Sequence, residues 1–164
     1  MQPDVTFRPA VPADYDTIIG VVDTWWGRPI AGALQRVFLD HFFRTCVVAE
    51  RQSARGEPRL AGFLVGFGSP ADPAQAYIHF VGVDPAERGS GLGRALYEAF
   101  FELMRADGRS IVHAVTSPVN SGSIAFHRSM GFHLTGPVTD YDGPGADRVV
   151  FSLALQERRE MQHD

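Results

Sequence analysis

The residues best suited to chemistry form a glycine-rich run at 88–94, which reads Arg-Gly-Ser-Gly-Leu-Gly-Arg. The run follows an apolar segment that ends at Val83 and leads into an amphipathic pattern, so it predicts a turn between a strand and a helix. The first N–H groups of a helix have no partner within the helix and carry the positive end of its dipole. Glycines let a ligand approach that backbone closely, and Arg88 and Arg94 add positive charge. The run therefore predicts an anion site suited to a pyrophosphate.

The spacing of the glycines excludes two common nucleotide motifs. A P-loop requires Gly-Lys-Ser/Thr, and the chain has Gly-Arg-Ala from Gly93, so ATP or GTP bound in that way is excluded. The dinucleotide fingerprint G-x-G-x-x-G is not matched from Gly89 or from Gly91. The pattern that fits is R-x-x-G-x-G, which runs from Arg88 to Gly93.

A second segment runs from Asn120 to Phe132 and reads Asn-Ser-Gly-Ser-Ile-Ala-Phe-His-Arg-Ser-Met-Gly-Phe. Together with R-x-x-G-x-G after a strand that ends in Val-Asp-Pro, it makes the chain resemble the GNAT superfamily of acyl-CoA-dependent N-acetyltransferases. The family pattern for this segment is N-x-x-A-x-x-F-Y-x-x-x-G-F. The chain departs from it at Ser123, where the family has Ala, and at His127, where the family has Tyr. Residues 76–132 carry the motifs, and the rest matches in the order of its elements.

The resemblance implies one N-acetyltransferase domain over residues 1–164 with an α/β fold. Its sheet would be mixed and mostly antiparallel, with six to seven strands, helices on both faces and a splayed parallel pair formed by 76–83 and 111–115. Acetyl-CoA, the acyl donor, would lie where that pair opens, with its pantetheine against the first strand's backbone like an added strand. No metal is implied. The residues expected to bind the cofactor are Val81, Gly82, Val83, Arg88, Gly89, Ser90, Gly91, Leu92, Gly93, Arg94 and Asn120.

Catalysis requires that the departing CoA thiolate gain a proton or be stabilised, and that the attacking amine lose one. The resemblance implies that the residue at the family's Tyr position donates to the thiolate, and His127 stands there. A cationic imidazole donates more readily than a phenol, because their ordinary pKa values are about 6.5 and about 10. The alternative is that His127 only fills the volume of the Tyr. The strand 76–83 carries no acid, so the base is open, and His79 is either a candidate base or a core histidine.

The resemblance also implies where the amine acceptor, a small molecule or a peptide, would bind. Its site would be built by the region between the first two helices, here 25–28 with adjacent tryptophans, and by the last strand–strand loop, here 139–147 with three aspartates. The candidate substrate-binding residues are Trp26, Tyr77 and His79. Neighbours on a helix point about 100° apart, so only one tryptophan fits fully in a core. The aspartates favour neutral or cationic amines, with loop solubility as the alternative.

The elements that position these residues are predicted in the order β-α-α-β-β-β-α-β-α-β-β. Strands are expected at 5–8, 46–50, 60–67, 76–83, 111–115, 132–134 and 149–155, and helices at 14–26, 29–42, 92–107 and 121–130. Pro29 would open the second helix, whose apolar face would be Leu34, Val37, Phe38 and Phe42. Alternation along 76–83 would place on one face Tyr77, His79 and Val81. The charged tail from residue 157 is expected to fray.

The composition narrows the function of this 164-residue chain. A net charge of −4 argues against nucleic acid as a partner, and no apolar stretch approaches the ~18 residues of a membrane span. The start, Met-Gln-Pro-Asp, lacks the basic and apolar segments of an export signal. A single cysteine excludes an intrachain disulfide framework, so we expect a cytoplasmic protein in which Cys46 is a small buried side chain. The histidines are not spaced like the ligands of a metal ion. The sequence is compatible with a homodimer.

The sequence thus predicts an acetyl-CoA-dependent N-acetyltransferase in which a primary amine attacks directly in a ternary complex. A non-catalytic acyl-CoA-binding module is the first alternative, because the usual Tyr and an acidic base are both missing. A nucleotide-binding protein that uses the glycine run for ATP or NAD is the second.

Overall fold

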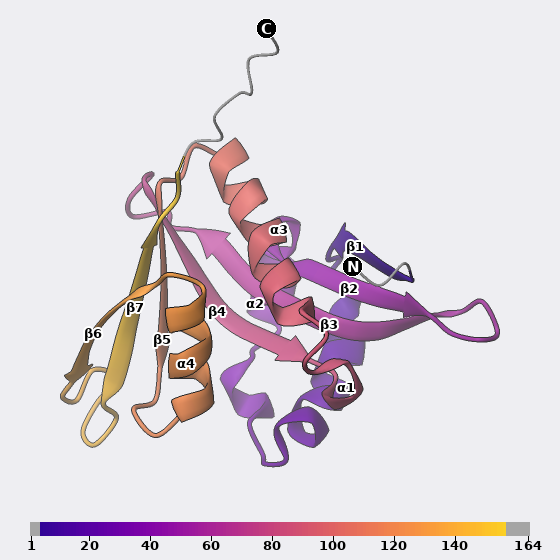
Figure 1. Cartoon of the computed structure of the whole chain (residues 1–164), viewed down its shortest axis with the longest axis horizontal. Coiled ribbons are helices and arrows are strands. Elements are labelled where there is room, and N and C mark those ends of the chain that lie inside the picture. The colour runs from indigo at the N-terminus through magenta and orange to yellow at the C-terminus, as the bar shows by residue number, and fades with distance from the viewer. Residues whose placement is uncertain (1–3, 157–164) are drawn as a thin grey trace, which may run out of the picture.

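A seven-stranded sheet in the order β1-β2-β3-β4-β5-β7-β6 forms the centre of the molecule (Figure 1). The computed structural model describes residues 4–156, so the predicted fraying of the tail from residue 157 lies outside the described residues. The elements are β1 (Val5–Pro9), α1 (Asp14–Trp26), η1 (Ala31–Ala33), α2 (Val37–His41), η2 (Phe43–Thr45), β2 (Val47–Gln52), β3 (Pro58–Gly68), β4 (Gln75–Val83), η3 (Pro85–Glu87), α3 (Leu92–Ala106), β5 (Ile111–Thr116), α4 (Ser121–Ser129), β6 (His133–Val138) and β7 (Arg148–Ala154).

The pairing of the strands confirms the predicted sheet. All neighbours are antiparallel except β4 and β5, which run parallel. This parallel pairing covers only Gln75–Tyr77 against Ile111–His113, so beyond Tyr77 the two strands splay apart. β3 still pairs with β4 as far as Val83, which holds the other edge of the splayed segment in the sheet.

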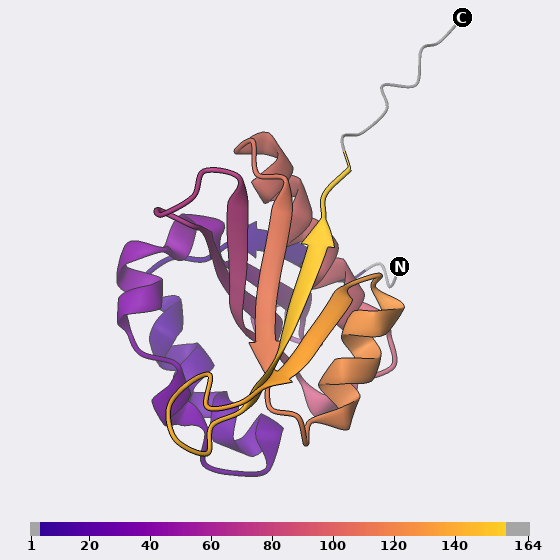
Figure 2. The same cartoon turned by 90° about the vertical axis from the view of Figure 1, so that its left-hand side faces the viewer.

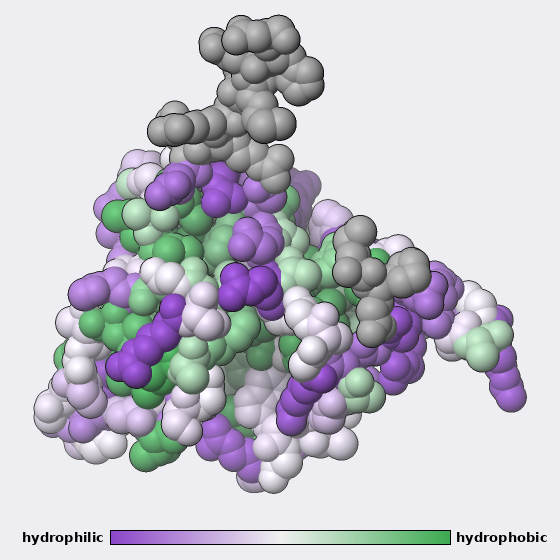
Figure 3. Space-filling model, viewed as in Figure 1, coloured by the Kyte–Doolittle hydropathy of each residue, from purple (hydrophilic) through white to green (hydrophobic). Residues whose placement is uncertain are grey.

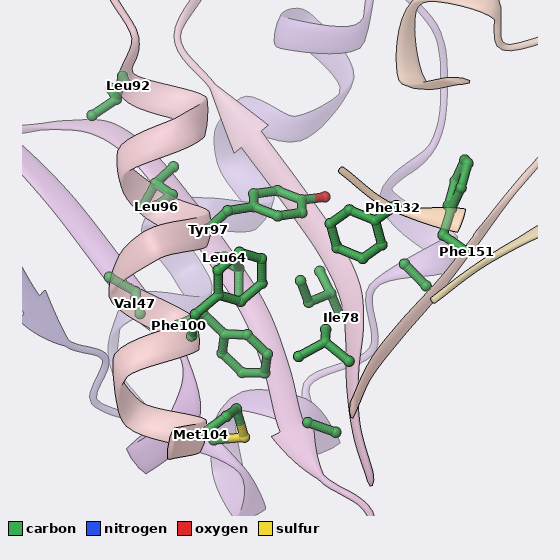
Figure 4. Close-up of a cluster of buried hydrophobic side chains, with 14 of the residues drawn as sticks. Val47, Leu64, Ile78, Leu92, Leu96, Tyr97, Phe100, Met104, Phe132 and Phe151 are labelled. Carbon is green, nitrogen blue, oxygen red and sulfur yellow. The ribbon is translucent and has the colours of Figure 1, made fainter. Parts of the chain in front are cut away.

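Helices cover both faces of the sheet, as predicted (Figure 2). α3 and α4 lie on one face, where Leu96 and Phe100 of α3 are fully buried against Leu64 and Phe151 of the strands (Figure 4). α1 and the segment 31–45 lie on the other face, over a second cluster that contains the fully buried Phe63. The apolar residues of α3 recur at helical spacing, so burial of this stripe fixes how the helix lies on the strands.

The single helix predicted from Pro29 is wrong, because residues 31–45 form three short helical pieces. The side chain of Asp23 accepts hydrogen bonds at 2.8 Å from two successive backbone N–H groups just after Pro29, which holds the chain in a turn there. The backbone of Leu34 is extended, so the first piece ends at that residue. The predicted apolar face fails at Val37, which is 47% exposed, while Leu39 is fully buried in its place.

The alternation predicted along β4 is broken by a bulge. Val65 pairs with Phe80 and Gly66 with Ile78, so His79 is the extra residue on β4. The ring of His79 stacks on Phe38 of α2, whereas Val81 packs against the cluster beneath α3. The prediction that Val81 shares a face with Tyr77 and His79 is therefore wrong.

Cys46 is 1% exposed and packs in the cluster beneath α1, which confirms it as a small buried side chain. Burial raises the pKa of its thiol to about 11. Within residues 4–156, no helix is both long and apolar enough to cross a membrane. The same part of the chain holds no group of three or more His, Cys, Asp and Glu side chains that could bind a metal ion.

Candidate active site

The glycine-rich run forms the turn that starts α3. Gly89 and Gly91 have φ angles of +79° and +85°, a region that favours glycine, and Gly91 is the N-cap of the helix. The first N–H group to bond back within the helix is that of Ala95, which donates to Gly91 O at 3.1 Å. The three preceding N–H groups, of Leu92, Gly93 and Arg94, have no acceptor within the helix. The predicted anion site therefore has the geometry of an open helix N-terminus.

Gly93 lies where α3, α4 and β4 meet. A Cβ at this position would lie 3.7 Å from Phe126 of α4 and 3.8 Å from Val83 of β4, which are ordinary contact distances. The protein alone therefore does not require glycine here. Arg94 spans the same gap, because its guanidinium donates to Ser129 O at the end of α4 at 3.2 Å. Figure 3 shows the face of the molecule that carries α3 and α4, with hydrophobic groups visible between the polar ones.

Arg88 and Ser90 lie in the turn as expected, and both are exposed. The guanidinium of Arg88 donates to Trp25 O at 2.7 Å, at the end of α1, so this side chain ties the turn to the helix on the opposite face. The hydroxyl of Ser90 donates to Glu87 O. Whether Arg88 also contacts a pyrophosphate stays a prediction.

Glu87 is a residue of the turn that the sequence reasoning missed. It is buried, and its carboxylate accepts two hydrogen bonds from the guanidinium of Arg51 on β2, at 2.6 and 2.7 Å. Hydrogen bonds from Arg51 lower the pKa of Glu87, so the carboxylate is ionised at neutral pH. The pair anchors the turn to the sheet. The sequence shows that Glu87 lies in the motif, but it does not indicate which of the chain's arginines would meet it.

A cavity of about 180 Å³ lies where β4 and β5 splay. Its lining comes from both faces of the sheet, so the cavity passes between the two strands. The lining residues are Trp26, Ile78, His79, Phe80, Val81, Tyr97, Ala114, Val115, Thr116, Asn120, Ser123 and His127. Four predicted site residues, namely Trp26, His79, Val81 and His127, therefore line one cavity together with the predicted Asn120. The side-chain oxygen of Asn120 caps α4 by accepting from Ser123 N at 3.1 Å.

His127 is buried, and both nitrogens of its ring have partners. Nδ1 lies 2.7 Å from Ser123 O, and because a carbonyl only accepts, Nδ1 carries the hydrogen of the neutral ring. Nε2 then accepts from the hydroxyl of Tyr97 at 3.0 Å. The ring also stacks on Phe151 at 3.9 Å. Burial lowers the pKa of His127, which disfavours the cationic form that the sequence reasoning assumed.

Tyr97 is a second residue that the sequence reasoning missed. It comes from α3, is 3% exposed and points its hydroxyl away from the helix toward the side where Phe132 and Phe151 lie (Figure 4). Burial raises the pKa of its hydroxyl, so it stays protonated. In the sequence Tyr97 looks like one more apolar residue of an amphipathic helix. Only the meeting of α3 with α4 reveals its pairing with His127.

His79 lines the same cavity from the face that carries α2. Its Nε2 lies 2.8 Å from Ala33 O, and the carbonyl can only accept, so Nε2 carries the hydrogen. The other ring nitrogen, Nδ1, therefore keeps its lone pair. Burial lowers the pKa of His79, so the ring is neutral at neutral pH. His79 thus has one nitrogen that can accept a proton, and its role as a base stays a prediction.

The two tryptophans differ as expected for neighbours on a helix. Trp25 is buried and stacks on Phe63 at 6.0 Å, so it belongs to the core. Trp26 is half-buried and its ring lies over Gly82, where a Cβ would be 2.9 Å from the indole. Gly82 is therefore needed for this packing. Its backbone remains available along the splayed segment of β4, together with that of Val83.

A larger hollow of about 520 Å³ adjoins the last paired residues of β4 and β5. It is lined by Phe67, Ser69, Gln75, Ala76, Tyr77, His113, Val115, Tyr141 and Val150. Val115 also lines the smaller cavity, so the two hollows adjoin along one strand pair. The loop 139–147, which supplies Tyr141, lies on the same side of the sheet as α1 and α2 (Figure 2). Tyr77 is thus on the larger hollow, apart from Trp26.

The three aspartates of the loop 139–147 are used within the hairpin. Asp142 accepts from the guanidinium of Arg148 at 2.8 Å. Asp140 accepts from Gly145 N at 2.8 Å, and Asp147 accepts from Asp140 N at 2.9 Å. None of the three lines the larger hollow. Their predicted role in attracting cationic amines therefore has no direct support from their positions.

Comparison with known proteins agrees with this geometry. The model of the acetyltransferase (GNAT) family matches residues 12–132. The L-methionine sulfoximine/L-methionine sulfone acetyltransferase of Pseudomonas aeruginosa is 29% identical over 140 residues, which cover 78% of this chain and 76% of that protein. The mycothiol acetyltransferase of Kocuria rhizophila is 40% identical over 83 residues, or 49% of this chain, and the match spans only 27% of that protein.

The fold likeness extends over nearly the whole chain. The diaminobutyrate acetyltransferase EctA of Paenibacillus lautus, solved with L-2,4-diaminobutyric acid and coenzyme A, has a TM-score of 0.70 at 20% identity. The match covers 93% of this chain and 95% of that one, and at this identity it shows the fold alone. The family match at 12–132 covers well over half of the chain. The chain therefore belongs to the acetyltransferase (GNAT) family.

Proposed function

We propose that this protein transfers an acetyl group from acetyl-CoA to a primary amine by direct attack in a ternary complex. The observation that carries the proposal is the cavity between the splayed strands, which Tyr97 of α3 and His127 of α4 line from one face and which shares Val115 with the larger hollow. Cofactor and acceptor can then approach the same cavity from opposite faces of the sheet. The family membership of the chain supports the same activity.

In this proposal the cofactor follows the open edge of β4. The pyrophosphate would bind the N–H groups of residues 92–94, and the positive end of the α3 dipole would favour its charge. The pantetheine would pair with the edge of 81–83 that faces β5, where β5 does not pair, as an added strand. The thioester would then lie in the cavity beside Tyr97 and His127.

The chemistry needs one proton acceptor and one group that stabilises the thiolate. As the amine nitrogen forms a bond to the carbonyl carbon, its proton would pass to the neutral Nδ1 of His79, directly or through one water. As the carbon–sulfur bond breaks, the hydroxyl of Tyr97 would turn from Nε2 of His127 and donate to the sulfur. His127 would act as a positioning residue for Tyr97, which revises the cationic acid predicted from the sequence.

The acceptor is proposed to be a small amine or a peptide amine. The relative from Pseudomonas aeruginosa is named for acetylating small molecules, which supports the small-molecule branch. A cytoplasmic location goes with this proposal, since Cys46 is a free thiol, as expected in a reducing compartment.

A non-catalytic acyl-CoA-binding module is the second candidate. It is favoured by the absence of any Asp or Glu from β4 and by the histidine at the family's Tyr position. Two measurements separate the candidates: calorimetric titration with acetyl-CoA, and release of the CoA thiol in the presence of a panel of amines. An acetyltransferase binds acetyl-CoA and releases CoA only with certain amines. Binding of acetyl-CoA without amine-dependent release of CoA would support the non-catalytic binding module.

A third outcome separates both from the nucleotide-binding alternative. If ATP or NAD raised the melting temperature and CoA did not, the glycine run would serve a nucleotide, because a ligand stabilises the native state that binds it.

A further inference from the structure

The lining of the larger hollow contains no Asp, Glu, Lys or Arg side chain. Besides the imidazole of His113, its residues are aromatic, aliphatic or neutral and polar. A carboxylate on a substrate bound there would lose water without gaining an Arg or Lys partner, which is costly. The hollow therefore disfavours acceptors with an acid group beside the amine.

The charged groups nearest to the hollow already have partners. Arg109 donates to Ser69 O, Asp72 O and Gln75 O at 2.8 to 3.1 Å, and to Asp107 at 2.9 Å, so its guanidinium organises the β3–β4 connection. Arg148 is paired with Asp142 at 2.8 Å. Both guanidinium groups therefore already serve contacts within the protein.

Aromatic rings line the hollow from β3, β4 and the loop 139–147. The rings of Phe67 and Tyr77 lie 5.8 Å apart on β3 and β4, and the ring of Phe67 also contacts that of Phe42 at 4.9 Å. Tyr141 comes from the loop 139–147 and is 48% exposed, so much of its ring is free for contact. A flat aromatic body can pack on such rings, and an ammonium group is attracted to their faces.

The spacing along β4 relates this aromatic site to the proposed base. Tyr77 lines the larger hollow and His79 lines the cavity, and two residues of a strand span about 6.6 Å. An amine carried on a short chain from a ring beside Tyr77 would reach His79. With a longer chain between ring and amine, the ring would lie outside the hollow when the amine is at His79.

From this arrangement we infer that the acceptor is a primary amine joined by a short aliphatic chain to an aromatic ring, with no carboxylate beside the amine. This inference rests on the proposed acetyltransferase function and specifies the substrate class of the same site. Three observations support it: the aromatic lining without Arg or Lys, the contacts that already engage Arg109 and Arg148, and the position of His79.

The test compares amines that differ in one group, with release of CoA from acetyl-CoA as the readout. Tyramine and tyrosine differ by the carboxylate, and hexylamine offers an apolar body without a ring. We expect kcat/KM for tyramine to exceed that for tyrosine and that for hexylamine by about tenfold or more. Equal use of tyrosine would overturn the exclusion of carboxylates, and equal use of hexylamine would overturn the role of the ring.

Failure of the proposed function would look different, because no amine of any class would then release CoA from bound acetyl-CoA. A pair of variants gives a second readout. Tyr141→Ala should raise KM for tyramine several-fold and by a larger factor than KM for hexylamine, with the Kd of CoA unchanged. Val138→Ala is the matched control, since Val138 lies in the same hairpin, is 37% exposed and does not line the hollow. If Tyr141→Ala behaved like Val138→Ala, the aromatic site would not be where the acceptor binds.

Discussion

Two glycines of the same turn should respond to substitution in opposite ways. Gly91 has a φ angle of +85°, which an alanine reaches only at a cost of about 1–2 kcal/mol. Gly93 has an ordinary helical backbone, and a Cβ there makes contacts of 3.7 and 3.8 Å without a clash. Gly93→Ala should therefore stabilise the protein by about 0.4–1 kcal/mol, through the lost freedom of the unfolded chain. The sequence reasoning treated both glycines as equivalent ligand contacts.

Binding of CoA should separate the role of Gly93 in the ligand site from its role in the fold. A single Cβ at Gly93 makes only ordinary contacts, so Gly93→Ala should bind CoA nearly as the parent does. Gly93→Val places two further methyl groups in the gap between Val83 and Phe126. We expect its Kd for CoA to rise by about tenfold or more, which corresponds to about 1.4 kcal/mol.

The assays are thermal unfolding without ligand and calorimetric titration with CoA. For a domain of this size, 1 kcal/mol shifts the melting temperature by about 2–4 °C. Gly108→Ala is the matched control for strain, since Gly108 has a φ angle of +77° at the far end of α3. It should lower the melting temperature and leave CoA binding unchanged. Parent-like CoA binding by Gly93→Val would refute the assigned pyrophosphate site, and a parent-like melting temperature of Gly91→Ala would refute the argument from the φ angle.

Four further outcomes are expected. His79→Gln should remove the acidic limb of the kcat/KM profile, which in the parent should fall as pH drops below 6.5, because burial lowers the pKa of the imidazole that must be neutral; an unchanged limb would exclude His79 as the base. Tyr97→Phe and His127→Phe should each lower kcat by about 10²-fold while the affinity for CoA is unchanged. The parent should stay active at pH 8. If catalysis required a cationic His127, activity would be lost at that pH, because burial lowers the pKa of this imidazole. Glu87→Gln should weaken CoA binding several-fold without touching the cofactor, and in the parent the contribution of the Arg51–Glu87 pair to stability should be lost as pH falls below 4.5, because the pKa of Glu87 is lowered in the folded state; full CoA affinity in the variant would show that the turn needs no anchor. Cys46, with a pKa of about 11 and 1% exposure, should react with thiol reagents only in denaturant, and fast labelling of the native protein would contradict its burial.

The order and type of most elements followed from the sequence because the pattern there was strong. Gly108 and the stripe of α3 marked a long helix, and alternating or β-branched runs marked the strands. The segment 31–45 was misread because an apolar pattern at helical spacing does not reveal the Asp23 side chain that holds the turn after Pro29. The bulge at His79 was invisible for a related reason, since it is set by pairing with β3 rather than by β4 alone.

The candidate site divides in the same way. Glycines at a helix start have a local physical meaning, so the predicted anion site could be read directly from the residues. The pairs Tyr97–His127 and Arg51–Glu87 join residues that are 30 and 36 positions apart. Such pairs depend on how elements pack, and a single sequence carries no record of that packing. Similarly, the protonation of His127 depends on burial among aromatic rings, which the motif alone did not indicate.

The short seam between β4 and β5 has a consequence for how the two halves of the sheet move. Only three residue pairs join β1–β4 to β5–β7–β6, so the seam is the weakest line across the sheet. Opening along it would expose the amides that pair 75–77 with 111–113 without unfolding either half. In hydrogen–deuterium exchange these amides should therefore exchange ahead of those in β3. A pantetheine bound as an extra strand would bridge the two strands where they splay. The cofactor would then restrict the motion of one half of the sheet relative to the other.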